Sequence, residues 1–214
     1  VFLQDKHYFT KKLILNAGLR CDSKYRANSV RVNALSPRVA LIYMPKNDFS
    51  MKLSYSRSFV DAPYFYRRNT DNSYLGAEDL KSEYLNAIQF YILGEIAPIH
   101  LTYDVNLFYN KFTDMIYSIP MVEFEDAKFR NSGKLEIMGA EMDVHYNHKR
   151  MKADLTACYS YVLSAKDYYY NNNHIYAIPN FVTNGVFSYN ILSKPSHRLW
   201  VRPDRKSGSA GMPR

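Results

Sequence analysis

Acidic and imidazole side chains gather in one part of the chain, where their types would suit acid–base catalysis or metal binding. Glu141, Asp143 and His145 alternate along Met138–Tyr146, and Asp104 lies in an earlier segment. Alternate residues of a strand share a face, so the first three would lie together. No glycine-rich phosphate loop, nucleophile elbow or His-Glu-x-x-His motif accompanies them. We interpret them as a charge network on a wet surface and predict no enzyme, cofactor or metal site.

The elements that carry these residues are predicted to be strands. In Ile99–Tyr109 the odd positions are apolar or aromatic, whereas the even positions are mostly polar. A helix would scatter both sets around its circumference, so this period of two indicates a strand with one dry and one wet face. The same alternation predicts eight strands, at Leu13–Arg20, Arg38–Met44, Met51–Phe59, Tyr84–Ile92, Ile99–Tyr109, Met138–Tyr146, Met151–Leu163 and Phe181–Asn190.

The connections between these segments alternate between short and long. Short turns are expected at 45–48, 94–98 and 147–150, where the residue types suit tight turns. Long polar connections are expected near 21–34, 60–82, 112–134 and 164–179. The pattern predicts an all-β fold, an antiparallel up-and-down meander with short turns at one end and long loops at the other. Outer-membrane barrels have this arrangement.

The polar face must meet water, because an unpaired charge in a dry core costs several kcal/mol. In a soluble sandwich that face would be the outer surface, and in a membrane barrel it would line a wet lumen. Segments longer than the ordinary ~5–6 residues, and tyrosines near strand ends on the apolar face, favour the barrel. The predicted lumen-lining residues are Asp104, Asn106, Glu141, Asp143, His145, Lys152 and Asp154.

Composition excludes several other classes of protein. The chain has 214 residues, of which 47% are hydrophobic, and it is therefore not compositionally disordered. No apolar run approaches the ~18 residues of a membrane-spanning helix. The formal net charge of +8 invites a nucleic-acid partner, but the positive charges are dispersed and form no concentrated stripe, so we predict none. The two cysteines, Cys21 and Cys158, form no metal-ligand pattern.

Two predicted outer loops combine aromatic and basic side chains that could capture a ligand. Aromatic rings stack on ligands, and arginine donates charge-assisted hydrogen bonds to them. The alternative role is anchoring at the membrane interface or contact with lipopolysaccharide. The candidate ligand-binding residues are Tyr64, Tyr66, Arg67, Arg68, Tyr168 and Tyr169.

Several segments resemble strands of TonB-dependent outer-membrane receptors. Residues 15–22 are similar to a strand of the form L-x-x-G-x-R-x-D, and residues 53–63 to S-Y-S-R-S-F-x-x-P. Residues 106–116 resemble x-x-F-Y-N-x-F-x-D-x-I. Further similarities lie at Ser36-Pro37-Arg38, at Leu80–Ile92, and at Asn131-Ser132-Gly133 followed by Met138–Glu141. The order and spacing of these motifs extend the resemblance from about residue 12 to residue 191.

The resemblance implies a barrel of about twenty-two strands with an N-terminal plug. This chain departs from the family pattern because it has about eight strands and no recognisable plug. We therefore expect a fragment from the C-terminal half of a receptor. Its expected parts are a partial barrel at residues 1–193 and an atypical or disordered tail at residues 194–214.

The function that the resemblance implies is active transport in the outer membrane of a Gram-negative bacterium. The cargo would be a scarce nutrient such as an iron chelate or cobalamin. The expected partners are outer-membrane lipid and lipopolysaccharide, a ligand such as a metal chelate, and the TonB complex through the missing plug. Two alternatives stay open: a passive porin or channel, and a soluble β-sandwich binding module.

Overall fold

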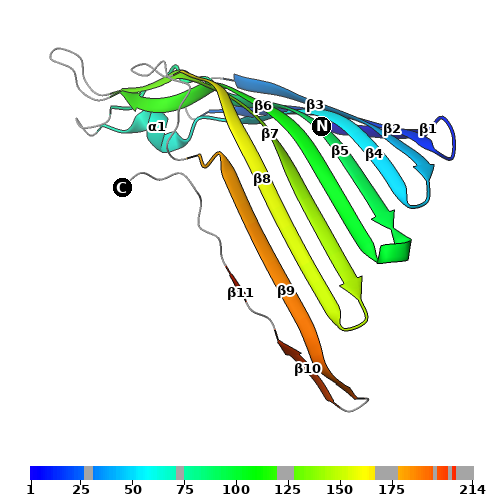
Figure 1. Ribbon diagram of the computed structural model, residues 1–214. Coiled ribbons are helices and arrows are strands. Elements are labelled where there is room, and N and C mark those ends of the chain that lie inside the picture. Colours follow the sequence, from blue (N-terminus) through cyan, green and yellow to red (C-terminus); the bar gives the residue numbers. More distant parts are fainter. Residues whose placement is uncertain are drawn as a thin grey trace.

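The computed structural model describes residues 1–26, 31–70, 75–119, 128–166, 178–194, 197–201 and 204–205. Ten of the described strands form one antiparallel sheet in which spatial order follows chain order, and an eleventh pairs with β9 (Figure 1). The strands are β1 Phe2–Tyr8, β2 Leu13–Tyr25, β3 Arg31–Lys46, β4 Phe49–Val60, β5 Glu83–Ile96, β6 Leu101–Ile119, β7 Lys128–His148, β8 Met151–Lys166, β9 Phe181–Lys194, β10 His197–Val201 and β11 Asp204–Arg205.

The predicted all-β antiparallel meander is confirmed, and all eight predicted strands are present. The strands are longer than predicted, however, so parts of the expected loops at 21–34 and 112–134 are wrong. Strand β6 continues to Ile119 and β7 begins at Lys128. Polar residues beyond the apolar band still form backbone hydrogen bonds to the neighbouring strand, so the strands extend past the segments in which apolar and polar residues alternate. Strands β1, β10 and β11 were not predicted, because their short sequences lack clean alternation.

Short and long connections lie at opposite ends of the sheet (Figure 1). At the turn end, β3 meets β4 through two residues, and β7 meets β8 through two more. A 3-10 turn at Ala97–Ile99 joins β5 to β6. At the loop end, residues 61–82 connect β4 to β5 and carry the short helix α1, Tyr64–Arg68. In the described part of the chain no helix is both long and apolar enough to cross a membrane.

One face of the sheet is apolar and uncovered. Leu53, Leu107 and Leu155 are 51%, 45% and 44% exposed, and no large side chain among the described residues is fully buried. Monomeric soluble proteins rarely expose an apolar surface of this extent. The apolar residues therefore do not gather into a compact dry centre, as a β-sandwich would require. This face needs hydrocarbon against it.

Gly94 on β5 shows how locally the strands are fitted to each other. It lies directly opposite Tyr103 on β6. A Cβ atom at Gly94 would lie 2.4 Å from the Tyr103 phenol, so only glycine leaves room for the ring. An aromatic ring packed over a glycine on the neighbouring strand protects that weak point of the ladder and fixes the pairing register.

Candidate functional site

The seven predicted lumen residues all lie on the polar face of the sheet. In the β6–β7 ladder Asp104 is opposite Asp143, and Asn106 is opposite Glu141. In the β7–β8 ladder His145 is opposite Asp154. Lys152 is opposite Asn147, and its ammonium lies 5.2 Å from the centre of the Trp200 ring. We call this group the lumen tract. Residues opposite each other in an antiparallel strand pair share a face of the sheet. The register of β6, β7 and β8 therefore places residues up to 50 positions apart in the sequence on the same face.

Side chains of the lumen tract bond to one another in pairs. The Asn106 amide donates to Glu141 at 3.0 Å, and His145 Nδ1 lies 2.8 Å from an Asp154 carboxylate oxygen. The Thr156 hydroxyl donates to Asp143. Asp104 and Asp143 are nevertheless two carboxylates placed directly opposite each other. Like charges in this position repel unless water screens them, so the tract must be wet.

The predicted ligand-binding residues of the 61–82 loop lie on or beside helix α1. Tyr64 is exposed, whereas Tyr66 stacks on Phe129 with ring centres 4.4 Å apart. Arg67 is buried and donates to the Ala62 carbonyl at 3.1 Å. Arg68 forms an ion pair with Glu78. Tyr168 and Tyr169 lie outside the described residues. Ligand binding by these six residues stays a prediction.

A small apolar cluster joins the loops to the sheet. Ala62, Leu80 and Phe129 are buried together, and Tyr66, Ala77 and Ile116 pack against them. Phe129 is 7% exposed and comes from the outer end of β7. Its backbone N–H donates to the Leu75 carbonyl at 3.3 Å. We call this group the loop core. It packs the described parts of the β4–β5 connection, residues 61–70 and 75–82, against the outer ends of β6 and β7.

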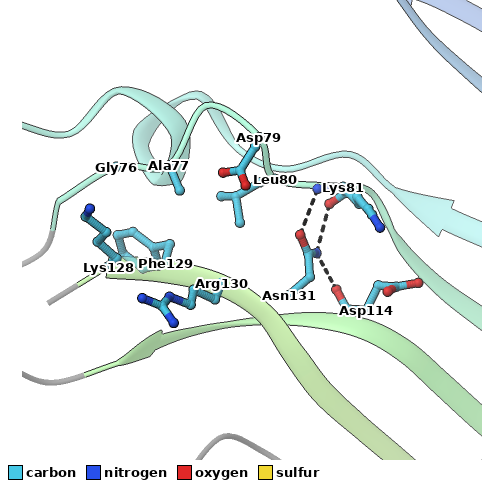
Figure 2. A pocket seen from close by; sticks show the side chains of 10 residues that line it. All are labelled: Gly76, Ala77, Asp79, Leu80, Lys81, Asp114, Lys128, Phe129, Arg130 and Asn131. Atoms are coloured by element: carbon cyan, nitrogen blue, oxygen red, sulfur yellow. Dashed lines mark hydrogen bonds between the residues drawn. The ribbon is translucent and has the colours of Figure 1, made fainter. Parts of the chain in front are cut away.

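Asn131 ties three chain segments together beside the loop core. Its amide oxygen accepts the Lys81 N–H at 2.7 Å, and its amide nitrogen donates to the Lys81 carbonyl at 3.0 Å. The same nitrogen donates to the Asp114 carbonyl at 2.6 Å. One side chain of β7 thereby fixes the loop before β5 and the outer part of β6 (Figure 2).

Asp61 ties the loop to the β2–β3 connection. Its carboxylate pairs with Arg26 and with Lys24, and the Ser82 hydroxyl donates to it at 3.1 Å. The Asp61 and Arg26 side chains are each only 5% exposed. Burial alone would raise the pKa of the Asp61 carboxyl, but the hydrogen bonds from Arg26, Lys24 and Ser82 outweigh burial and lower it to about 2. The carboxylate is therefore charged at any physiological pH.

These ties shape a pocket of about 540 Å³ at the loop end, which we call the loop pocket. Figure 2 shows the residues of the 76–81 segment on one side of it and those of β7 on the other. Three cationic side chains line it, from Lys81, Lys128 and Arg130, together with the carboxylates of Asp79 and Asp114. The volume is in the usual range for small-molecule sites.

Sequence reasoning missed the loop pocket and its supports. Asn131 and Lys81 are 50 residues apart, and Arg26 and Asp61 are 35 apart. The single local signal was the N-x-G motif that begins at Asn131, which was interpreted as a strand feature and not as a support for a loop. Within the described residues no cluster of three or more metal-ligating side chains is found.

Comparison with known proteins decides the family. Residues 1–202 match the family described as "TonB dependent receptor-like, beta-barrel". The chain belongs to the TonB-dependent receptor family. The predicted resemblance is thereby confirmed. No curated protein matches the chain.

Solved structures of TonB-dependent receptors share the fold of this fragment. The FrpB iron transporter of Neisseria meningitidis (F3-3 variant) is 14% identical, with a TM-score of 0.69 over 91% of this chain and 30% of its own. The siderophore receptor PirA of Acinetobacter baumannii is 18% identical, with a TM-score of 0.71 over 89% and 31%. The alcaligin outer membrane receptor FauA of Bordetella pertussis is 16% identical, with a TM-score of 0.64 over 94% and 35%.

The chain thus spans about a third of the length of these TonB-dependent receptors. Membership places it in the outer membrane of Gram-negative bacteria and in a family of transporters, which are not enzymes. It also explains the uncovered apolar face, which is the lipid-facing side of a barrel wall. In a barrel of this kind the polar face would be the inner side, and the lining of the lumen by the residues of the lumen tract stays a prediction. The division at residue 193 stays a prediction.

Proposed function

We propose that this receptor fragment forms part of the wall and outer loops of an active transporter that imports an anionic metal chelate. Membership of the receptor family supports transport. The matched structures include proteins described as iron and copper transporters and siderophore receptors. At this low sequence identity the matched structures support the fold of the chain but not the identity of its ligand. The loop pocket is therefore the basis for the ligand class.

The observation that supports an anionic ligand is the balance of charge in the loop pocket. Lys81, Lys128 and Arg130 line the pocket together with only two carboxylates, and all three cationic residues are exposed. Lysine and arginine donate charge-assisted hydrogen bonds to carboxylate, hydroxamate or catecholate oxygens of a chelate. Phe65 is 57% exposed beside the loop core and 6.2 Å from the Phe129 ring, where it offers a stacking surface.

The route beyond the loops would follow the lumen tract. Its paired amide, imidazole and carboxylate groups keep the inner wall hydrated, so a polar chelate would cross without losing all of its hydration. Energy would come from the TonB complex through a plug domain, as the family resemblance implies. Tyr64, Tyr66, Arg67, Arg68, Tyr168 and Tyr169 remain candidates for outer capture.

The test uses the complete open reading frame that encodes this chain, expressed in a Gram-negative host lacking its own chelate receptors. Uptake of radiolabelled ferric hydroxamate and catecholate chelates is measured with and without a functional TonB. The site variant carries Lys81→Gln, Lys128→Gln and Arg130→Gln. The matched control removes three exposed cations at the turn end through Lys11→Gln, Lys46→Gln and Arg150→Gln.

We expect saturable uptake that needs TonB, and a KM raised at least about tenfold in the site variant, because each lost charge-assisted bond contributes about 1.5–3 kcal/mol. The control variant should retain the parent KM. Linear, TonB-independent uptake would instead favour the passive channel. Equal effects of the two triple variants would show that bulk charge, and not the loop pocket, attracts the chelate.

A further inference from the structure

Two histidines that are far apart in the sequence meet at the turn end of the sheet. His100 follows the 3-10 turn between β5 and β6, and His148 is the last residue of β7. Because β6 and β7 are neighbouring strands, their turns lie at the same end of the sheet (Figure 1). The two imidazole rings stack with their centres 4.3 Å apart and their planes 28° from parallel. Two protonated rings in this position would repel, so at least one ring is neutral and offers a nitrogen lone pair.

The backbone of His100 is held in an uncommon conformation. Its φ of 53° and ψ of 42° lie in the left-handed region, where a side chain strains the backbone and glycine would not. Its N–H donates to the Ala97 carbonyl at 3.1 Å, and its carbonyl accepts the Asn147 N–H at 3.1 Å. Residues held in strained conformations concentrate at ligand-binding sites. The turn therefore presents an imidazole at a position that its backbone does not favour.

Met151 supplies a third metal ligand beside the two rings. It lies directly opposite His148 across the turn that joins β7 to β8, and it is 40% exposed. Directly opposed residues of an antiparallel pair share a face of the sheet and have close Cβ atoms, so the flexible thioether can reach the His148 ring. Among the described residues, histidine, cysteine, aspartate and glutamate form no group of three that could hold a metal. A metal bound here therefore needs the methionine sulfur.

The types of these ligands select the metal. Imidazole suits several transition metals, whereas a thioether is a soft ligand that favours Cu(I). The neighbouring turn residues Lys149 and Arg150 are exposed cations, and they oppose a divalent ion more strongly than a monovalent one. Partial burial lowers the pKa of His148, and the nearby His100 and Lys149 lower it further. The His148 ring is therefore held in the neutral form that binds metal.

We propose that His100, His148 and Met151 form a binding site for a Cu(I) ion at the turn end of the receptor. In outer-membrane barrels the end with short turns faces the periplasm. His100 is exposed, so its ring can rotate out of the stack until one nitrogen of each ring points at the same ion. Sequence reasoning predicted no metal site, because nothing local shows that these two histidines meet. The site lies at the opposite end of the strands from the loop pocket and does not depend on the ligand proposed there.

The test measures Cu(I) binding by the complete receptor, purified in detergent from outer membranes. Cu(I) is supplied anaerobically with ascorbate and competes between the receptor and a chromogenic Cu(I) chelator. The site variants are His100→Asn, His148→Gln and Met151→Leu. Asparagine tolerates the left-handed backbone at position 100, and leucine has nearly the volume of methionine. Heat-modifiable gel migration confirms that each barrel has folded.

Two matched control variants remove the same kinds of side chain elsewhere. His7→Gln removes an exposed histidine of β1 that lies opposite Leu15, where no sulfur ligand is available. Met142→Leu removes an exposed methionine of β7. Zn²⁺ binding is measured on the same proteins, because zinc takes imidazole nitrogen and does not favour a thioether.

We expect each site variant to raise the Kd for Cu(I) at least about tenfold, since even the loss of a group that only supports a metal ligand weakens binding by about that much. The two controls should keep the Kd of the parent, and Met151→Leu should leave Zn²⁺ binding unchanged. The parent Kd for Cu(I) in His148→Gln or in Met151→Leu would overturn the proposal. So would equal losses in the site and control variants, or an equal loss of Zn²⁺ and Cu(I) binding in Met151→Leu.

A second measurement needs no substitution. Diethyl pyrocarbonate modifies accessible imidazole nitrogens, and peptide mass spectrometry of the parent receptor locates the modified histidines. Saturating Cu(I) should protect His100 and His148 from modification and leave His7 reactive. Equal modification of His100 and His148 with and without Cu(I) would overturn the proposal.

Discussion

Substituting Asp61 by Asn should open the loop end of the barrel without unfolding the sheet. The change removes the charge that pairs with Arg26 while keeping the size of the side chain. Arg26 would then be left 5% exposed with its charge uncompensated, although it would still donate to the Leu80 carbonyl at 2.7 Å. Removing one partner of a buried ion pair is strongly destabilising for this reason.

The size of the effect follows from the pKa of Asp61. A fall from the ordinary value of 3.8 to about 2 corresponds to about 2.4 kcal/mol of favourable interaction with the charged form. Screening by nearby solvent reduces this to about 2 kcal/mol. The equilibrium for local opening of the 61–82 loop should therefore rise by about thirtyfold.

Amide hydrogen exchange on the complete receptor in detergent or nanodiscs measures this opening. Exchange should accelerate by about thirtyfold near Lys81 and Ser82, while the middle of β5 stays protected. Asp22→Asn is the matched control, because Asp22 pairs with the largely exposed Arg20 and its loss should change exchange no more than a few-fold. Equal effects of both substitutions, or none from Asp61→Asn, would refute the argument that burial makes the Asp61 pair strong.

The pH dependence has a defined sign. Because the pKa of Asp61 is lower in the folded state, its contribution is complete above about pH 4. It is lost as the pH falls from about 4 through about 2. The parent loop should therefore approach the exchange behaviour of Asp61→Asn at low pH, and the Asp61→Asn loop should lack this acid transition. An identical acid transition in both proteins would assign it to another group.

Two further predictions concern the sheet faces and the loop support. Leu155→Lys, on the lipid face, should destabilise the barrel in lipid vesicles by about 2–4 kcal/mol, whereas Thr156→Lys on the lumen face should destabilise it much less. Urea unfolding, followed by heat-modifiable gel migration, measures the stability of both variants. Equal destabilisation by the two substitutions would contradict the assignment of faces. Asn131→Ala removes three hydrogen bonds and should destabilise the loop by about 2 kcal/mol. Hydrogen exchange at the Lys81 amide should therefore become faster. The control Asn147→Ala, at the turn end, should leave the exchange rate of the Lys81 amide unchanged.

Much of the sheet could be predicted because its rules are local. Alternation places Leu101, Tyr103 and Val105 on one face and Asp104 on the other, whatever the neighbouring strands are. The same rule grouped the lumen tract before any register was known. It failed at β1, where charged and apolar residues fall on both faces, and at the outer ends of β6 and β7, where strands leave the hydrocarbon and alternation is no longer required.

The loop end could not be predicted in this way. Arg67 was expected to reach a ligand, yet the structure uses its guanidinium inside the loop, on the Ala62 carbonyl. Whether it also contributes to capture stays a prediction. Phe129 and Asn131 were assigned to a long loop and the strand that follows it, and nothing in their local sequence showed that they support residues 61–82.

The sequence by itself determined which face of each strand meets lipid and which meets water, because side chains alternate with a period of two regardless of partner. It also determined the order of turns and loops. Only the tertiary structure decided which distant residues meet, such as Asp61 with Arg26 and Lys81 with Asn131. Those contacts depend on the register between strands. Backbone pairing over the whole sheet sets this register, and no single segment of the sequence encodes it.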